Sequence, residues 1–397
     1  MTDPTVPPTP ALPDETSPDL PALAPVRAIP GDAAAPEEGM ALCLSGGGAR
    51  AMLFHAGSLL RLNELGLLAT LQRISSVSGG SIVAGVLGRR WSELAFDATG
   101  RSANLGALVV EPLRDLGRRS IDVSTWIIGT LLPGTTPVLR LADLLDQRLL
   151  SGVTLQDLPG SPRFVYNATN LASGVLWRFE RPYMADYRVG SVPNPRVRLA
   201  IAVAASCAFP PFYSPLRLKV DLASYSPGVY ELGTDEYRSE PQLADGGVYD
   251  NLGLETAWKR YKTILVSDGG GAMVDQPRPA TDLLRQSIRV ARVVDGQVRA
   301  LRKRMLIDGF QAGIRDGSYW GVRSDIGAYP ITDGLPCPAD ATAALAALPT
   351  RMNGLPDLTT KRLVNWGYAI TDVALRAHVV TDATPPTAFP YPDAGVG

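Results

Sequence analysis

The chain has 397 residues, 45% of them hydrophobic, which is enough to bury one large core or two smaller ones. Its formal net charge is −1, with an acidic stretch at residues 1–38 and a mild positive excess beyond it, so composition offers no case for a nucleic-acid partner and is compatible with an anionic membrane surface. The three cysteines, Cys43, Cys207 and Cys337, are too few for a disulfide framework and indicate a reducing compartment.

Proline-rich segments stand at both ends of the chain. Residues 1–38 hold ten of the 34 prolines and seven acidic residues, and we expect a disordered tail because such a segment cannot bury apolar surface. Residues 380–397 suggest a second, C-terminal tail, which leaves residues 39–379 as one domain. We find no signal peptide and no run of 18 apolar residues, and therefore expect a cytoplasmic protein whose membrane contact is peripheral.

Between these segments, short apolar runs alternate with segments of helical spacing. Such alternation predicts an α/β fold with a mostly parallel sheet covered by helices on both faces, and active sites of such sheets lie beyond the carboxyl ends of the strands. In chain order we predict a strand at 40–44, a helix at 53–68, a strand at 73–77, a helix at 80–90, strands at 164–170 and 176–179, a helix at 198–206, a strand at 242–245, a helix at 251–259, a strand at 263–267, and helices at 280–306 and 358–378.

The first glycine-rich turn, Gly46-Gly47-Gly48, follows the strand at 40–44. Three glycines let backbone N–H groups converge on an anion at a helix start, and in acyl transfer that anion is the tetrahedral intermediate. We therefore predict an oxyanion hole here, with Arg50 either adding charge or anchoring the loop. A nucleotide phosphate is the alternative ligand, but the Gly-Lys-Ser/Thr of a phosphate-binding loop does not follow.

The second turn, residues 76–81, places Ser78 between a predicted strand and a predicted helix. A nucleophile elbow strains its central residue and needs small residues two positions before and after it. Ser76 and Gly80 meet this need for Ser78, whereas the other serines of the turn would have an isoleucine or a valine at such a position. We predict Ser78 as the nucleophile; a loop that merely caps the next helix is the alternative.

Two Asp-Gly-Gly turns, at Asp245 and Asp268, supply candidate carboxylates, and their spacing does not decide between them. The chain has only two histidines, His55 in a predicted packed helix and His378 near the C-terminus. A Ser-His-Asp triad would need one of them, and a core role is the expected one for His55. The residues thus favour a Ser–Asp dyad in which the carboxylate is the general base.

Taken together, these motifs resemble the patatin-like phospholipases. The match rests on the two glycine turns and on Asp245-Gly246-Gly247, together with residues 167–174 and 204–212, all in the family's order within residues 40–255. The resemblance implies a three-layer α/β sandwich with a mostly parallel central sheet, and hydrolysis of fatty-acyl esters of lipids or phospholipids. It also implies a Ser78–Asp245 dyad, an oxyanion hole from Gly46, Gly47 and Gly48, and supporting roles for Arg50, Gly80 and Gly246.

Departures from the family leave the chemistry intact but obscure the substrate. Residues 48–53 are closer to the cytosolic phospholipase branch than to plant patatins, and Ser76 replaces the first glycine of the elbow. A thioesterase or small-ester esterase on the same dyad, or a catalytically silent lipid-binding module, is the alternative function. The sequence has no His/Cys cluster and no acidic calcium loop, so we predict no metal or other cofactor.

Two segments suggest how the chain would contact a membrane, where its lipid substrate lies. Residues 126–134 are apolar and contain Trp126, and could enter the headgroup boundary; a buried lid or core segment is the alternative. The helix at 280–306 carries basic residues along one face, which would be either solvated or directed at headgroups. These residues are Arg285, Arg289, Arg292, Arg299 and Lys303.

Overall fold

The computed structural model describes residues 36–121, 135–271, 273 and 275–397. The apolar segment at 126–134 and nearly all of the N-terminal segment therefore lie outside the described residues. Within the described ranges, no helix is both long and apolar enough to cross a bilayer.

Ten strands form one sheet in the described part of the chain, in the order β10-β9-β1-β2-β3-β4-β5-β6, with β8 paired to β3 and β7 paired to β8. The first five strands of that order are mutually parallel, and the later pairs are antiparallel. The strands are β1 (Glu37–Leu44), β2 (Arg73–Ser76), β3 (Arg163–Asn170), β4 (Val175–Phe179), β5 (Tyr183–Asp186), β6 (Gly190–Pro193), β7 (Leu216–Arg217), β8 (Gln242–Asp245), β9 (Tyr261–Asp268) and β10 (Asp316–Gly321).

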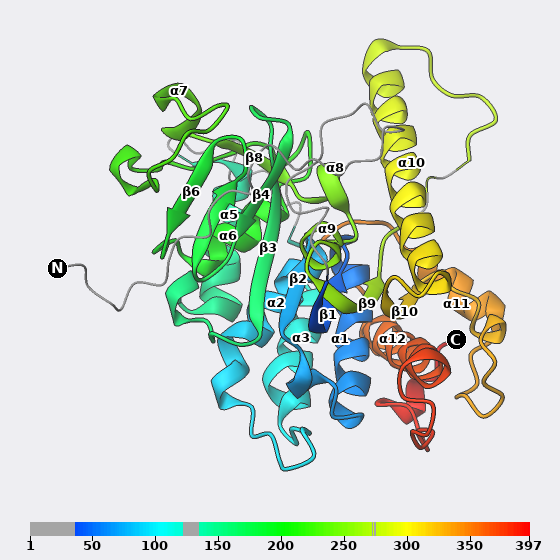
Figure 1. The fold of residues 1–397 in the computed structure, drawn as a ribbon. Coiled ribbons are helices and arrows are strands. Elements are labelled where there is room, and N and C mark those ends of the chain that lie inside the picture. The colour runs from blue at the N-terminus through cyan, green and yellow to red at the C-terminus, as the bar shows by residue number, and fades with distance from the viewer. Residues whose placement is uncertain (1–35, 122–134, 272, 274) are drawn as a thin grey trace.

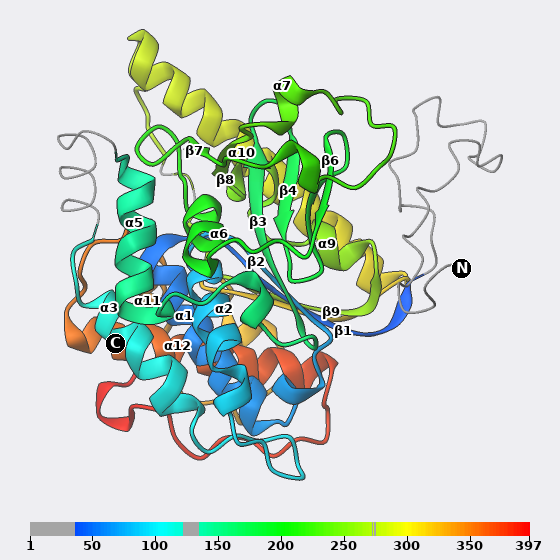
Figure 2. The ribbon, with the colours of Figure 1, turned by 90° about the vertical axis from the view of Figure 1, so that its left-hand side faces the viewer.

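Helices cover both faces of this sheet, as Figures 1 and 2 show. Leu42 and Leu44 of β1 point into a large core shared with α1, α2 and α12, whereas Ala41 and Cys43 point into a smaller core on the other face, beneath α9 and the later part of α10. The helices are α1 (Gly48–Glu64), α2 (Gly79–Arg90), α3 (Glu111–Gly117), α5 (Pro137–Leu145), α6 (Leu199–Ser206), α7 (Asp235–Arg238), α8 (Gly247–Asp250), α9 (Glu255–Trp258), α10 (Leu283–Gln311), α11 (Ala339–Ala346) and α12 (Asp357–His378).

Helices α1 and α12 pack closely because each presents a glycine to the other. A Cβ at Gly57 would lie 1.9 Å from the carbonyl oxygen of Val364, and a Cβ at Gly367 would lie 1.9 Å from that of Phe54. Next to this contact, the buried Arg61 guanidinium lies 2.7 Å from an Asp372 carboxylate oxygen. The contact with α12 thereby holds α1, the helix that begins at the first glycine turn, in place.

The predicted α/β fold with a mostly parallel sheet between helical layers is confirmed. Each strand and helix named from the sequence has a counterpart whose ends shift by a few residues, apart from the segment at 251–259, where the helix begins only at Glu255. Strands β5, β6, β7 and β10 were not anticipated. The C-terminal segment expected to be a tail lies against α12, where the Asn365 side chain donates to the carbonyl oxygens of Tyr391 and Gly395 at 2.8 and 2.7 Å.

The pairing of β2 and β8 with the same strand, β3, positions the site. Both strands pair with the same edge of β3: Ser76, the last residue of β2, lies opposite Tyr166, and Asp245, the last residue of β8, lies opposite Ala168. Because β2 runs parallel to β3 and β8 runs antiparallel to it, the two carboxyl ends point toward one another. The turns that follow them therefore meet.

Candidate active site

Ser78 occupies a strained turn between β2 and α2. Its backbone angles are φ 50° and ψ −118°, a region that costs a residue with a side chain about 1–3 kcal/mol. The turn is tight enough that a Cβ at Gly79 would lie 2.4 Å from the carbonyl oxygen of Gly48, and one at Gly80 2.3 Å from that of Leu44. The supporting position predicted for Gly80 thus lies against the start of the glycine loop, and the geometry is that of a nucleophile elbow.

Asp245 lies beside Ser78 and is 3% exposed. Burial raises the pKa of its carboxyl group to about 7, partly offset by the hydrogen bond from the Gly247 N–H and by the neighbouring Ser78 hydroxyl. The Gly247 N–H donates to Asp245 Oδ1 at 2.7 Å, and a Cβ at Gly246 would lie 2.3 Å from the carbonyl oxygen of Asn167. The turn therefore presses against β3 and directs the carboxylate at the elbow.

Asp268, on the other Asp-Gly-Gly turn, has different partners. It ends β9, accepts the Tyr319 hydroxyl at 2.8 Å and lies 3.7 Å from an Arg299 guanidinium nitrogen. The structure records no contact between Asp268 and Ser78 in the described part of the chain. Of the two carboxylates that the sequence left open, Asp245 is the one next to the serine.

The glycine loop presents free backbone donors near Ser78. Gly46 donates its N–H to the carbonyl oxygen of Asn251 at 3.0 Å, so this predicted oxyanion donor already has a partner. The N–H groups of Gly47 and Gly48 have no acceptor among the described residues. Gly47 and Gly48 also have φ values of 153° and 63°, where a side chain is disfavoured.

Sequence reasoning missed a further donor, the N–H of Gly79. It has no acceptor among residues 36–121, 135–271, 273 and 275–397, and Gly79 lies against Gly48. Its position directly after the serine was the available signal, because that residue commonly completes the oxyanion hole of an elbow.

Arg50 anchors the loop. Its buried guanidinium donates to the carbonyl oxygens of Gly269 and Ala346 at 3.1 and 3.3 Å, to that of Leu348, and to the Thr350 hydroxyl at 3.0 Å. Burial lowers its pKa to about 10. Of the two roles considered for Arg50, the contacts are those of an anchor.

The two histidines lie apart from the chemistry. His55 is fully buried in α1, where Nδ1 lies 2.8 Å from Ser267 Oγ and Nε2 lies 2.9 Å from the carbonyl oxygen of Ser45. Burial lowers its pKa to about 4, so the ring is neutral at pH 7 and supports the loop from beneath. His378, at the end of α12, lies beside the Tyr329 ring with 6.1 Å between ring centroids.

The end of α6 contributes two site residues whose roles the sequence did not indicate. Ser206 Oγ accepts the Ser78 N–H at 3.0 Å. Cys207 is buried beside the Ser78 side chain, and burial raises its pKa well above the ordinary value. In the sequence, this segment was marked by the predicted helix at 198–206 and the block at 204–212, and neither gave these two residues a role.

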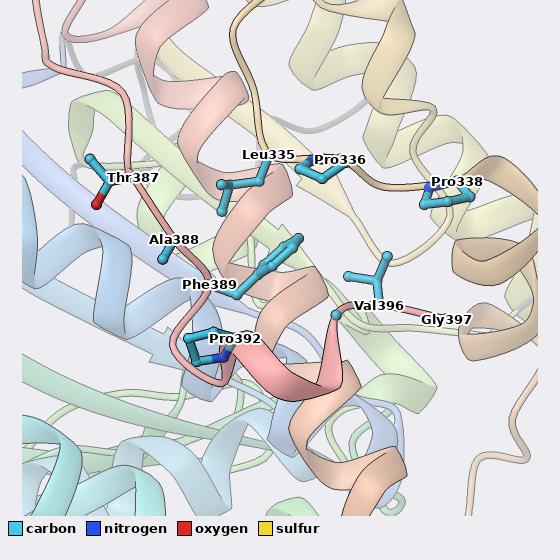
Figure 3. Close-up of a pocket in the computed structure, with 10 residues that line it drawn as sticks. Leu335, Pro336, Pro338, Thr387, Ala388, Phe389, Pro392, Val396 and Gly397 are labelled. Carbon is cyan, nitrogen blue, oxygen red and sulfur yellow. The ribbon is translucent and has the colours of Figure 1, made fainter.

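A surface pocket lies apart from these residues. It has a volume of about 510 Å³ and lies between residues 335–338 and the C-terminal segment, with Phe389 and Val396 among its lining residues (Figure 3). Neither Ser78 nor Asp245 lines it.

Comparison with known proteins identifies the family. Residues 42–258 match the family model described as patatin-like phospholipase, more than half of the chain. The chain belongs to this family. Its membership supports an enzyme that hydrolyses lipid esters, and no curated protein sequence matches the chain significantly.

One solved structure supports the fold of this patatin-like chain, and a second superposes with a lower score. Human GIVD cytosolic phospholipase A2 superposes with a TM-score of 0.51 at 13% identity, covering 84% of this chain and 58% of that one. VipD from Legionella pneumophila matches with a TM-score of 0.33 at 15% identity, covering 85% of this chain and 66% of that one. The chain thus spans less than two thirds of either protein's length.

Proposed function

We propose that this protein is a serine lipid acyl hydrolase that cleaves fatty-acyl esters through a Ser78–Asp245 dyad. The observation that carries the proposal is that Ser78, at a strained elbow, interacts with the buried Asp245 carboxyl group, whose pKa burial raises to about 7 and the Ser78 hydroxyl lowers in part. A base with a pKa near the working pH combines a useful ionised fraction with enough basicity to take a hydroxyl proton.

The reaction would proceed in two half-reactions. Ser78 Oγ attacks the ester carbonyl as its proton passes to Asp245, and the oxyanion accepts hydrogen bonds from the N–H groups of Gly47 and Gly48, with Gly79 as a third donor. The proton returns to the departing alcohol, which leaves an acyl-enzyme. Asp245 then takes a proton from water as the water oxygen attacks the acyl carbonyl. The proton passes from Asp245 to Ser78 Oγ as the bond between Oγ and the acyl carbon breaks, which releases the fatty acid and restores both residues.

The proposal includes a substrate held in a membrane surface. Phe209 and Phe212, which follow the Ser206-Cys207 pair, are 54% and 57% exposed, and Val248 close after Asp245 is half exposed. Apolar side chains beside a site can enter the headgroup boundary, at about 25 cal/mol for each Å² removed from water.

The basic face of α10 supports this contact less than the sequence suggested. Arg299 pairs with Asp268, and Lys303 lies 4.3 Å from the centroid of the Tyr319 ring, so both are directed at the protein. We therefore assign the membrane contact to the apolar residues near the site rather than to these two cations.

Mass spectrometry of mixed phospholipid vesicles tests the activity. The wild-type protein should release fatty acid and react with a fluorophosphonate probe, and Ser78→Ala should do neither. Hydrolysis of thioesters or small esters alone would favour the alternative esterase, and no turnover of any ester would favour a silent lipid-binding module. Equal probe labelling of Ser78→Ala would place the nucleophile elsewhere.

A further inference from the structure

Three buried serine hydroxyls form a continuous chain behind the elbow. The Ser78 N–H donates to Ser206 Oγ at 3.0 Å, and Ser206 Oγ lies 2.8 Å from Ser81 Oγ. Ser81 Oγ donates to Ser76 Oγ at 3.0 Å, and Ser76 Oγ donates to the carbonyl oxygen of Val165 at 3.0 Å. The hydroxyls belong to β2, α2 and α6, and all three side chains are fully buried.

The hydrogen bond from Ser76 to Val165 determines which hydroxyl donates and which accepts in the rest of the series. A carbonyl oxygen can only accept a hydrogen bond, so the single O–H of Ser76 must donate to Val165. Ser81 then donates to Ser76, which leaves the Ser81 oxygen to accept from Ser206. Ser206 has thereby committed its proton to Ser81, and its lone pair faces the Ser78 N–H. Each of these three hydroxyls donates one hydrogen bond and accepts one, so none of the three is left without a partner.

Ser206 also ties the elbow to the carboxylate turn. Its side chain holds the Ser78 amide, and its carbonyl oxygen accepts the Gly246 N–H at 3.4 Å. Two residues later, the carbonyl oxygen of Ala208 accepts the Asp245 N–H at 2.9 Å. The end of α6 thus contacts the backbone on both sides of the serine–carboxylate pair.

We propose that Ser206, Ser81 and Ser76 are positioning residues, a directional hydroxyl chain that holds the backbone of Ser78 and so aims its Oγ at Asp245. The inference rests on the proposed function for its catalytic meaning. It explains why a serine stands at position 76, where related elbows have glycine: a glycine there would remove the hydroxyl that joins Ser81 to β3. It also means that the Ser78 N–H is engaged and is not an oxyanion donor.

Kinetics with a soluble short-chain ester test the chain. Ser206→Ala should lower kcat by roughly 10- to 100-fold with little change in KM, because a small displacement of the nucleophile slows chemistry without removing substrate contacts. Ser81→Ala and Ser76→Ala should cause smaller losses in kcat. The double variant Ser206→Ala/Ser81→Ala should lose little more than Ser206→Ala alone, because both changes break one chain.

The matched control is Ser318→Ala. Ser318 is also a buried serine, and it donates to the carbonyl oxygen of Ala374 at 3.1 Å where β10 meets α12; β9 and β1 separate β10 from β2 in the sheet. Its removal should leave kcat unchanged. Unchanged kcat in Ser206→Ala, or losses of Ser206→Ala and Ser81→Ala that simply multiply, would overturn the proposal.

A second measurement, by NMR, tests the serine hydroxyl chain without requiring catalytic turnover. In protein labelled with nitrogen-15 serine, the Ser78 amide signal should shift in Ser206→Ala and also in Ser81→Ala, although the hydrogen bonds of the Ser81 hydroxyl go to Ser76 and Ser206 rather than to that amide. An unmoved Ser78 amide in Ser81→Ala would overturn the directional chain. If the wild-type protein hydrolyses no ester, the proposed function fails, whereas this spectrum still decides on the chain.

Discussion

At the scale of single residues, Asp245 combines two opposing requirements. Burial favours its neutral form and raises its pKa to about 7, whereas a general base must be ionised to accept the Ser78 proton. Below pH 7 the carboxyl group is mostly protonated and cannot act. We therefore expect kcat/KM for a soluble ester to rise with pH through about 7 and then to level off. A profile that is flat between pH 5 and 8 would contradict this assignment.

The same shift predicts an effect on stability. The pKa of Asp245 is raised in the fold from 3.8 to about 7, so its stabilising contribution is full below the lower value and is lost as pH rises through the higher one. Asp245→Asn removes the buried charge. The Tm of Asp245→Asn minus the Tm of the wild-type protein should therefore be larger at pH 8 than at pH 4, as measured by calorimetry. Equal Tm differences at both pH values would argue that the carboxylate is not desolvated.

The two Asp-Gly-Gly turns should differ in kinetics. Asp245→Asn should abolish ester hydrolysis as fully as Ser78→Ala, because members of a dyad act as a unit. Asp268→Asn should retain most activity, since Asp268 is paired with Arg299 and Tyr319 rather than with the serine. Steady-state rates of the three variants give the ranking, and the reverse order would exchange the roles of the turns.

At the scale of secondary-structure elements, the contact of α1 with α12 supports the glycine loop from behind. Gly57→Ala should destabilise the protein by about 1–3 kcal/mol, because the new Cβ would overlap the backbone of α12. Gly296→Ala is the matched control: Gly296 is an exposed helical glycine of α10 with open space at its Cβ. It should stabilise the protein by about 0.4–1 kcal/mol. Denaturant unfolding measures both, and an unchanged Gly57→Ala would show that α12 shifts without strain.

At the scale of the whole molecule, the apolar surface near the site should matter only for substrates held in a bilayer. Phe212→Ser should slow hydrolysis of vesicle lipid several-fold and leave a soluble ester nearly unaffected, because less apolar area enters the interface. Ile314→Ser is the control. Ile314 is 56% exposed and precedes β10, at the edge of the parallel strands opposite the site. Equal loss on both substrates would place Phe212 in the acyl pocket instead.

Most of the fold, and the types of the site residues, follow from local sequence. The apolar run before each glycine turn predicts β1 and β2, because a short buried strand needs little beyond side chains that pack on both faces. The small residues around Ser78 predict the elbow, since its backbone leaves no room for larger ones. Strands β5, β6 and β7 could not be predicted in this way because they are short and lack a distinctive pattern.

What the sequence by itself determined is therefore the strand–turn–helix units and a serine at the apex of one of them. The tertiary structure decided which carboxylate meets that serine: β8 joins β3 antiparallel, in line with β2, and brings Asp245 to Ser78 across 166 intervening positions of sequence. It also decided that the Gly46 N–H donates to the carbonyl oxygen of Asn251 and that Ser206 Oγ accepts the Ser78 N–H. These are long-range pairings of backbone and side-chain groups, and local propensity carries no information about which distant partner satisfies a given donor.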